Sequence, residues 1–341
     1  MKKNLKTLAA LALTGVLALG IMGCSSNNDA ANTPADEGAD APAAATADST
    51  SLRFVTGGES GTYYAYGNVL AQYATNGDYG LNVTALAGNG SQANVQALED
   101  GDTDIAFCQS DVLAYAYEGT NLFEGAPYKD FSIVADLYQE QVQIVTCDPE
   151  IKSVADLAGK TVSVGAAGSG VYFNALDVLG VYDLTLDDIS PVYQSFGDSA
   201  DSLKDGKIDA AFIFAGAPTT AITDLSTTKE AYLVSMDDAH VKSLLELSPD
   251  YSKAVISADT YGLDADTTTV SVGAVVIANN SVSEDAIYNL TKSFFDGKAN
   301  NADAHAKYDE LVMADAAAIT AVPYHPGAAK YYEEQGITVA E

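Results

Sequence analysis

Two ten-residue stretches of the chain share one pattern, and this repeat decides the fold class. The first is Leu98-Glu-Asp-Gly101-Asp-Thr-Asp104-Ile-Ala-Phe107, and the second is Leu203-Lys-Asp-Gly206-Lys-Ile-Asp209-Ala-Ala-Phe212. In each stretch the glycine can take the left-handed conformation that ends a helix. A tight turn follows, and the second aspartate opens an apolar run that is typical of a buried strand. Each stretch therefore predicts a helix, a glycine turn and a strand.

A second pair of similar stretches precedes the first pair. Val55-Thr-Gly-Gly-Glu-Ser-Gly-Thr-Tyr-Tyr64 corresponds to Val164-Gly-Ala-Ala-Gly-Ser-Gly-Val-Tyr-Phe173. We expect strands at Leu52–Thr56 and Thr161–Val164, and helices at Tyr63–Tyr73 and Tyr172–Leu179. Repeated strand–helix units build a mostly parallel sheet with helices on its faces. The sequence thus predicts an α/β protein of two lobes, each a mostly parallel sheet flanked by helices.

The two Gly/Ser loops predict a ligand cleft between the lobes. Neither loop fits G-x-G-x-x-G with an acidic residue about 20 positions on, which argues against a dinucleotide site. Both loops lead into helix N-termini, whose N–H groups and partial positive charge favour carboxylates. In open α/β sheets such loops lie at the carboxyl ends of strands, where ligands bind.

The first 51 residues predict export and lipid anchoring. A basic start and the apolar run Leu8–Met22 are typical of a signal peptide over residues 1–23. The run ends in Ile21-Met22-Gly23-Cys24, which resembles the bacterial lipobox and predicts lipidation of Cys24. An ordinary secretory signal with an incidental cysteine is the alternative. Residues 24–51 are polar and acidic, so we expect a disordered tether that holds the protein on the outer face of a membrane.

Charge and motifs exclude several function classes. Without the three lysines of the signal peptide, the 16 basic residues fall to 13 against 47 acidic ones. This balance argues against nucleic acid or an anionic membrane surface as a partner, so the membrane is reached only through the anchor. No catalytic triad signature, P-loop or H-E-x-x-H occurs, and the three histidines are far apart. We therefore expect no enzyme activity, no metal and no cofactor, and two buried free thiols at Cys108 and Cys147.

Seven segments in order make the chain resemble a known family. It is similar to the TAXI-type solute-binding receptors of tripartite ATP-independent periplasmic (TRAP) transporters. The segments that carry the resemblance are Thr56–Tyr64, Gly88–Asn94, Ile105–Asp111 with Ala114–Gly119, Gly165–Asn174, Asp209–Pro218 and Val322–Ile337. Two departures fall near the expected pocket: Ala93 stands where the family often has Glu, and Glu59-Ser60 replaces smaller residues.

The resemblance implies a class II periplasmic-binding-protein fold that closes on its ligand by a hinge. The chain would cross between lobes near Gln139–Cys147 and Thr268–Ile277. Lobe one would then be 52–143 plus 273–341, and lobe two 144–272. The implied function is capture of a glutamate-like amino acid or dicarboxylate by a monomer and delivery to an ion-gradient-driven TRAP permease. A substrate-binding lipoprotein of an ATP-driven (ABC) importer is the alternative, and a surface hydrolase is a third hypothesis without a visible triad.

The candidate ligand residues follow from the loops and from the resemblance. Arg53, the only arginine, should lie at the far end of its strand, so helix N-termini and hydroxyls would have to hold a carboxylate. Tyr63 and Tyr172 are favoured for the cleft by their matching positions, although a tyrosine at such a position is more commonly a core aromatic. Asn94 and Gln109 can read an ammonium or amide, or can serve as surface and capping residues. The full set is Gly58, Ser60, Gly61, Thr62, Tyr63, Ser91, Asn94, Gln109, Ser169, Gly170, Val171, Tyr172, Gly216 and Pro218.

Overall fold

The computed structural model describes residues 49–341. The expected signal peptide, the lipidation of Cys24 and nearly all of the expected tether lie outside these residues. The tether was expected to reach residue 51, and this boundary is wrong by two residues. Strand β1 already begins at Thr50, because its backbone pairs with Leu81 of the neighbouring strand.

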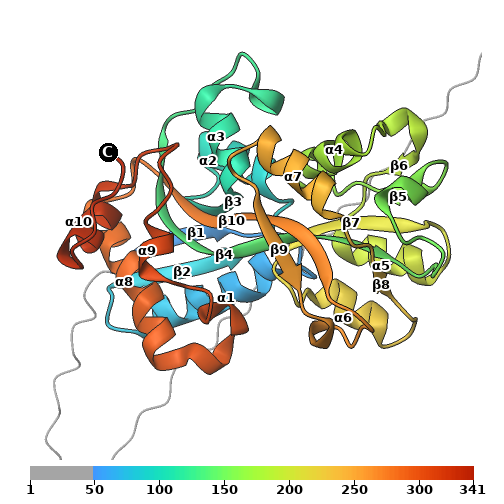
Figure 1. Cartoon of the computed structure of the whole chain (residues 1–341). Coiled ribbons are helices and arrows are strands. Elements are labelled where there is room, and N and C mark those ends of the chain that lie inside the picture. The colour runs from blue at the N-terminus through green and yellow to red at the C-terminus, as the bar shows by residue number, and fades with distance from the viewer. Residues whose placement is uncertain (1–48) are drawn as a thin grey trace, which may run out of the picture. The chain divides into compact units, whose positions relative to one another are not determined.

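Two sets of strands and helices follow one another along the chain (Figure 1). The first set contains β1 (Thr50–Val55), α1 (Thr62–Asn76), β2 (Leu81–Leu86), α2 (Ser91–Glu99), β3 (Ile105–Gln109), α3 (Ser110–Glu118) and the long strand β4 (Phe131–Thr146). The second set contains β5 (Thr161–Ser163), α4 (Val171–Val181), β6 (Ser190–Val192), α5 (Phe196–Lys204), β7 (Ala210–Ala215), α6 (Thr220–Ser226), β8 (Tyr232–Leu233), α7 (Asp238–Leu247) and β9 (Ser252–Ile256). The chain then forms β10 (Thr267–Asn279), α8 (Glu284–Asn301), α9 (Met313–Ala316) and α10 (Pro326–Glu334).

One mixed sheet connects the two sets of elements. Its main order is β2-β1-β3-β10-β4-β7-β5-β6, while β8 pairs with β4 and β9 with β10. Strands β1, β2 and β3 are parallel to one another, and so are β5, β6 and β7. The long strands β4 and β10 are antiparallel to each other and to the strands beside them. They run through the middle of the body in Figure 1, so both sets of elements share them.

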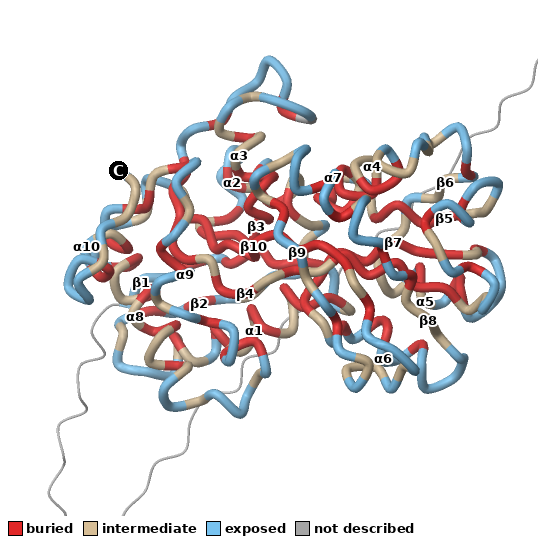
Figure 2. The backbone as a smooth tube through the Cα atoms, viewed as in Figure 1, coloured by how far each residue is buried: buried red, intermediate tan, exposed pale blue. Residues whose placement is uncertain are grey.

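The buried side chains divide at the middle of these two long strands. The largest cluster takes residues from Leu52 to Tyr138 and from Ala274 to Tyr332, together with Phe173. Two smaller clusters lie between Val142 and Val272. Figure 2 shows the central strands β3, β10, β4 and β7 buried along most of their length and many connecting loops exposed. We propose that the lobes divide at this boundary, with 52–143 and 273–341 in the first lobe and 144–272 in the second.

The repeated pattern forms the same hydrogen-bonded turn twice. Gly101 and Gly206 have φ of 74° and 69°, the left-handed region predicted for them. The N–H after each glycine donates to the carbonyl of the helix residue five positions back, at 2.8 Å in both turns, as in a Schellman motif. Asp104 Oδ2 then accepts the N–H of Arg53 at 2.7 Å, and Asp209 Oδ2 accepts the N–H of Thr161 at 2.7 Å. Each aspartate thus fastens its turn to the first strand of its lobe.

Cys108 and Cys147 are both free thiols, but only Cys108 is buried. The expectation of burial is therefore wrong for Cys147, which follows the end of β4.

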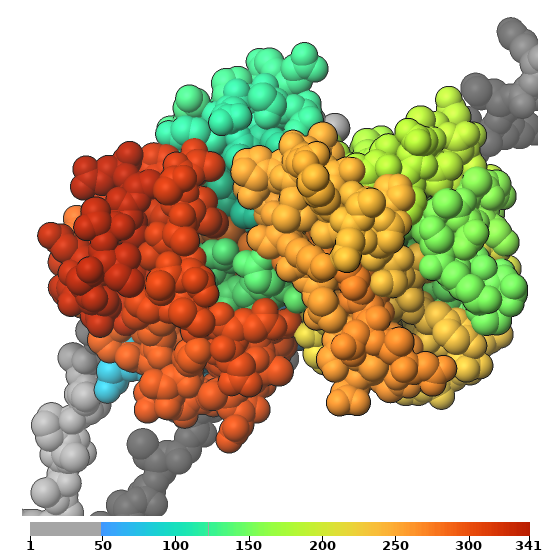
Figure 3. All heavy atoms as spheres, in the orientation of Figure 1, coloured from blue at the N-terminus to red at the C-terminus, as the bar shows by residue number. Residues whose placement is uncertain are grey.

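Figure 3 shows a hollow between the C-terminal segment and the β9 segment, with β4 at its floor. Asp136, Tyr138, Lys253 and Glu310 are among the residues that line it.

Alanine at either turn glycine should destabilise the protein. A Cβ at Gly101 or Gly206 meets no atom within 4 Å, so only the left-handed backbone opposes the substitution. Gly101→Ala and Gly206→Ala should each lower the free energy of unfolding by about 1–2 kcal/mol. Urea unfolding followed by circular dichroism measures this, and two variants as stable as the wild type would contradict the turn assignment.

Candidate functional site

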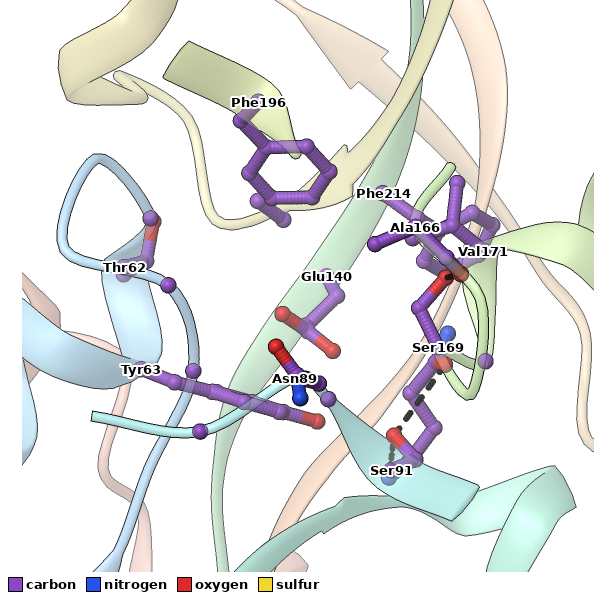
Figure 4. A pocket seen from close by; sticks show the side chains of 18 of the residues that line it. Thr62, Tyr63, Asn89, Ser91, Glu140, Ala166, Ser169, Val171, Phe196 and Phe214 are labelled. Carbon is purple, nitrogen blue, oxygen red and sulfur yellow. Dashed lines mark hydrogen bonds between the residues drawn. The ribbon is translucent and has the colours of Figure 1, made fainter. Parts of the chain in front are cut away.

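A cavity of about 90 Å³ lies between the two lobes, at the carboxyl ends of their parallel strands. This volume accommodates several water molecules or a small organic ligand. Figure 4 shows side chains from both lobes around it, with Thr62, Tyr63, Asn89 and Ser91 facing Ser169, Phe196 and Phe214. The complete lining is Gly57, Gly58, Gly61, Thr62, Tyr63, Gly88, Asn89, Gly90, Ser91, Gln109, Glu140, Ala166, Ser169, Gly170, Val171, Ser195, Phe196, Phe214 and Ala215.

Three of the helices that begin at the wall of this cavity follow a glycine. Gly61, Gly90 and Gly170 precede α1, α2 and α4, and none of the three helix ends has a side-chain cap. The first N–H groups of a helix have no intrahelical acceptor, and glycine supplies no side-chain oxygen to them. The N-terminal ends of these helices thus offer N–H donors and partial positive charge to one small volume.

The hydroxyl groups of Thr62, Ser91 and Ser169 in the wall already have protein acceptors. Thr62 Oγ1 donates to the carbonyl of Gly216 at 2.8 Å, and Ser169 Oγ donates to the carbonyl of Ala166 at 2.7 Å. Ser91 Oγ donates to Gln109 Oε1 at 3.2 Å and accepts the N–H of Gln109 at 3.1 Å. In this arrangement these hydroxyls donate within the protein, so their expected role in holding a ligand stays a prediction, and backbone N–H groups at the helix ends remain as donors.

Glu140 brings a carboxyl group into the same cavity. It lies in the middle of β4, is 3% exposed and points between Tyr63 and the phenylalanines of the second lobe (Figure 4). Burial raises the pKa of Glu140 well above its usual range, while Tyr63 and, more weakly, Lys307 lower it in part. The Tyr63 hydroxyl is buried without a hydrogen bond of good geometry, and its ring stacks on Phe107 with centroids 4.5 Å apart. The cavity therefore holds two polar groups that a ligand can engage.

The opposite wall of the cavity is largely apolar. Val171, Phe196, Phe214 and Ala215 come from the second lobe, which also supplies Gly170 and two serines, whereas the first lobe supplies the other glycines, Gln109 and Glu140. A ligand that fits this wall has a polar end towards the first lobe and an apolar part towards the second.

Nine of the fourteen predicted ligand residues line the cavity, and five do not. The nine are Gly58, Gly61, Thr62, Tyr63, Ser91, Gln109, Ser169, Gly170 and Val171. The five outside the wall are Ser60, Asn94, Tyr172, Gly216 and Pro218.

Hydrogen bonds and packing account for four of the five residues that do not line the cavity. Asn94 Nδ2 donates to the carbonyls of Thr56 and Phe107, so it joins the ends of β1 and β3. The carbonyls of Ser60 and Gly216 accept hydrogen bonds across the lobe interface. Tyr172 packs against Phe173 and Tyr193 instead of facing the cavity as its counterpart Tyr63 does.

Sequence reasoning missed the residues that no loop motif marks. Glu140 carried a signal, because it is one of only two acidic residues, with Asp136, in a long strand that is otherwise mostly buried. Phe196 and Phe214 carried none, since buried aromatic residues are common throughout such a fold. Asn89 and Gly90 lie within the segment Gly88–Asn94 but are not among the predicted ligand residues.

Arg53 lies in β1 and does not line the cavity, as predicted. Its guanidinium donates to both carboxylate oxygens of Asp104, at 3.0 and 2.8 Å. This pairing keeps the pKa of Asp104 below its usual range, mainly through the hydrogen bond from Arg53.

Direct contacts join the two lobes around the cavity. Ala93 N–H donates to the Gly168 carbonyl at 2.9 Å, and Ala221 N–H donates to the Ser60 carbonyl at 3.1 Å. A Cβ on Gly170 would lie 1.5 Å from Gln109 Oε1. The lobes are thus closed on each other, and Gly170 is needed for this approach.

Gly170→Ala should weaken ligand binding without harming the fold. Gly170 has φ −65° and ψ −25°, which alanine adopts freely, so the clash with Gln109 arises only when the lobes close. We expect affinity for any cavity ligand to fall about tenfold or more, while the melting temperature of the ligand-free protein stays near the wild-type value. Isothermal titration calorimetry and thermal unfolding measure the two quantities.

Gly180→Ala is the matched control, because it lies on the same helix and its Cβ meets no atom within 4 Å. Equal affinity of wild type and Gly170→Ala would show that ligand binding does not require the lobes to approach this closely.

Within residues 49–341, no group of three histidine, cysteine or acidic side chains is arranged to hold a metal ion. None of the helices in that range combines the length and apolar character of a membrane span.

Comparisons with known proteins show the fold and the family. A structure from Bordetella bronchiseptica RB50 is 15% identical, with a TM-score of 0.51, covering 78% of this chain and 76% of that one. A structure described as a periplasmic transporter is 14% identical, with a TM-score of 0.50, covering 77% of this chain and 88% of that one. A putative L-cystine ABC transporter from Listeria monocytogenes is 16% identical, with a TM-score of 0.47, covering 78% and 98%.

The chain thus has the α/β fold of periplasmic binding proteins. The model of the NMT1-like family matches residues 54–336, which is most of the chain. On this match, the chain belongs to the NMT1-like family.

Proposed function

We propose that this protein is an extracytoplasmic solute-binding protein, which captures a small organic ligand between its lobes and delivers it to a membrane importer. The observation that carries the proposal is the cavity at which three uncapped helix N-termini meet a buried carboxyl group. Concave sites between lobes with a few convergent polar groups are typical of small-molecule binding. The same groups include no nucleophile paired with a base, so binding explains them better than catalysis does.

The ligand is expected to carry an acidic group and a hydrogen-bond donor, with an apolar part between or beside them. The helix N-termini favour the acidic group. Glu140 is close to the cavity and accepts a donor such as an ammonium group, which stabilises its ionised form. Phe196 and Phe214 favour an apolar part. An α-amino acid satisfies all three requirements, whereas a dicarboxylate leaves Glu140 facing a like charge.

The importer class is the second part of the proposal. The TRAP assignment rests on the resemblance of short motifs. The Listeria neighbour is named as an ABC transporter, and such names agree better with the ATP-driven alternative. We therefore propose the ATP-driven importer as the partner to test first. We also retain the proposal that the protein is exported and anchored through Cys24, so that it meets the importer at the membrane surface.

The ligand class is testable with a defined panel and one substitution. L-Leucine, L-glutamate, succinate and ethanesulfonate are added to the protein, and a bound compound raises the melting temperature. We expect an amino acid to bind. Glu140→Gln should lower the affinity for that amino acid about 10- to 150-fold, because a charged hydrogen bond is lost. The affinity for succinate should not fall.

The pH dependence gives an independent check of Glu140. Its raised pKa means that the carboxyl group loses its proton only as the pH rises, so amino acid affinity should increase with pH in the wild type. This increase should be absent in Glu140→Gln. The matched control is the exposed Glu99→Gln. Unchanged affinity in Glu140→Gln would remove Glu140 from the ligand site.

The energy source is tested by uptake of the radiolabelled bound compound into cells. Depleting ATP while the ion gradient is maintained should stop uptake by an ATP-driven importer. Dissipating the ion gradient with ionophores while ATP is maintained should leave it largely intact. The reverse pattern would support the TRAP permease and overturn the ATP-driven assignment.

A further inference from the structure

Asn174 of helix α4 forms hydrogen bonds to residues of both lobes. Its side chain is fully buried, with 0% exposure. Nδ2 donates to Asp111 Oδ2 at 2.8 Å and to the Tyr251 hydroxyl at 3.0 Å, and Oδ1 accepts from Gln109 Nε2 at 2.9 Å. Gln109 and Asp111 belong to the first lobe, at the junction of β3 and α3, while Tyr251 belongs to the second. A single amide therefore bridges the closed lobes.

The partners of Asn174 fix which way its amide points. The Tyr251 hydroxyl donates its proton to Asp177 Oδ2 at 2.8 Å, so towards Asn174 its oxygen accepts. The Asp111 carboxylate also accepts. Both N–H groups of the amide are then used, and Oδ1, which can only accept, is left facing Gln109.

The orientation of Asn174 in turn fixes the orientation of Gln109. Gln109 lines the cavity, whereas Asn174 does not. The Gln109 amide nitrogen faces Asn174, and its oxygen faces the hydroxyl of Ser91 at 3.2 Å. One N–H of Gln109 remains without a protein acceptor among these contacts. Separation of the lobes removes the Asn174 partner, so the cavity amide is held in this orientation only when they are closed.

The surroundings of Asn174 already contain the carboxyl groups of Asp111, Asp177 and Asp250, so a further negative charge is unfavourable there. Asp111 is completely enclosed, and burial raises its pKa to about 7, while the hydrogen bond from Asn174 lowers it in part. Asp250 and Asp177 raise it further. The titratable groups around this point are Cys108 on β3, Asp111 and Tyr115 on α3, Glu140 on β4, Asp177 on α4, and Asp250 and Tyr251 before β9.

We propose that Asn174 is a positioning residue, which couples the closure of the lobes to the orientation of the Gln109 amide in the cavity. This proposal rests on ligand binding between the lobes, the function proposed above. It assigns a role in affinity to a side chain that does not touch the ligand.

Asn174→Asp is the most direct test, because it keeps the shape and replaces the two donors with an acceptor. At pH 8 the introduced carboxylate faces Asp111 and Asp177, which opposes closure. We expect the affinity for the amino acid of the panel that binds the wild type most tightly to fall about tenfold or more at pH 8. The affinity should recover towards the wild-type value at pH 5.5, where the introduced carboxyl group is protonated and donates again.

A second substitution should rescue the first at pH 8. Asp111→Asn in the Asn174→Asp background exchanges donor and acceptor across the lobe interface, so the bridging hydrogen bond forms again with its direction reversed. The introduced carboxylate also still accepts from Gln109 Nε2. Affinity at pH 8 should return to within about threefold of the wild-type value. A residue needed only for stability would show neither the pH recovery nor the rescue.

Asn82→Asp, an exposed site on β2, is the control for the added charge and should bind like the wild type at both pH values. Unchanged affinity of Asn174→Asp at pH 8, or a loss that neither pH 5.5 nor Asp111→Asn restores, overturns the proposal. If the wild type binds none of the panel, the ligand proposal fails by itself. Solution scattering of the ligand-free proteins then decides: a larger radius of gyration for Asn174→Asp than for the wild type at pH 8 supports the role of Asn174, and equal radii overturn it.

Discussion

The pairing of β4 with β10 is the constraint on which the rest of the structure depends. These antiparallel strands lie next to each other in the sheet, and each also pairs with a strand of one lobe, β10 with β3 and β4 with β7. The backbone hydrogen bonds of both lobes therefore meet in one pair of strands. Because the chain crosses there twice, the lobes keep their register while their far ends remain free to approach. The cavity lies where this approach is completed.

Glycine makes that approach possible at several points of the lobe interface. A Cβ on Gly61 would meet the ring of Phe196 at 3.4 Å, and one on Gly90 would meet Ser169 at 3.1 Å. The most crowded position is Gly170, opposite Gln109. The same glycines leave the helix N-termini uncapped, so one residue type allows both the closure and the free N–H donors. This double role explains why the cavity wall is rich in glycine.

The ionisation of the acidic residues in and beside the site depends more on burial than on ion pairs. The lone arginine is held by Asp104 outside the cavity, so positive potential comes from backbone dipoles and, weakly at Glu140, from Lys307. Glu140 and Asp111 are buried acids whose pKa values burial raises, and each depends on uncharged neighbours, Tyr63 for Glu140 and Asn174 for Asp111. A ligand with an ammonium group would add a positive charge beside Glu140. Asp111 instead accepts the hydrogen bond from Asn174 when the lobes close.

The sequence by itself determined the local units and their order. The Leu98–Phe107 repeat predicted two glycine turns that the backbone confirms, because left-handed φ values and helix ends depend on a few adjacent residues. The two Gly/Ser loops also predicted that the segments after the first strands reach one cavity, and the place of Arg53 in its strand predicted that Arg53 does not reach it. Only the tertiary structure decided the residues that come from distant segments. Glu140 enters the site because two crossing strands form the floor between the lobes, and Tyr172 leaves it because Tyr193 packs beside it. Asn174 meets Asp111 only when the lobes close, and no pattern along the chain records a contact between residues 63 positions apart.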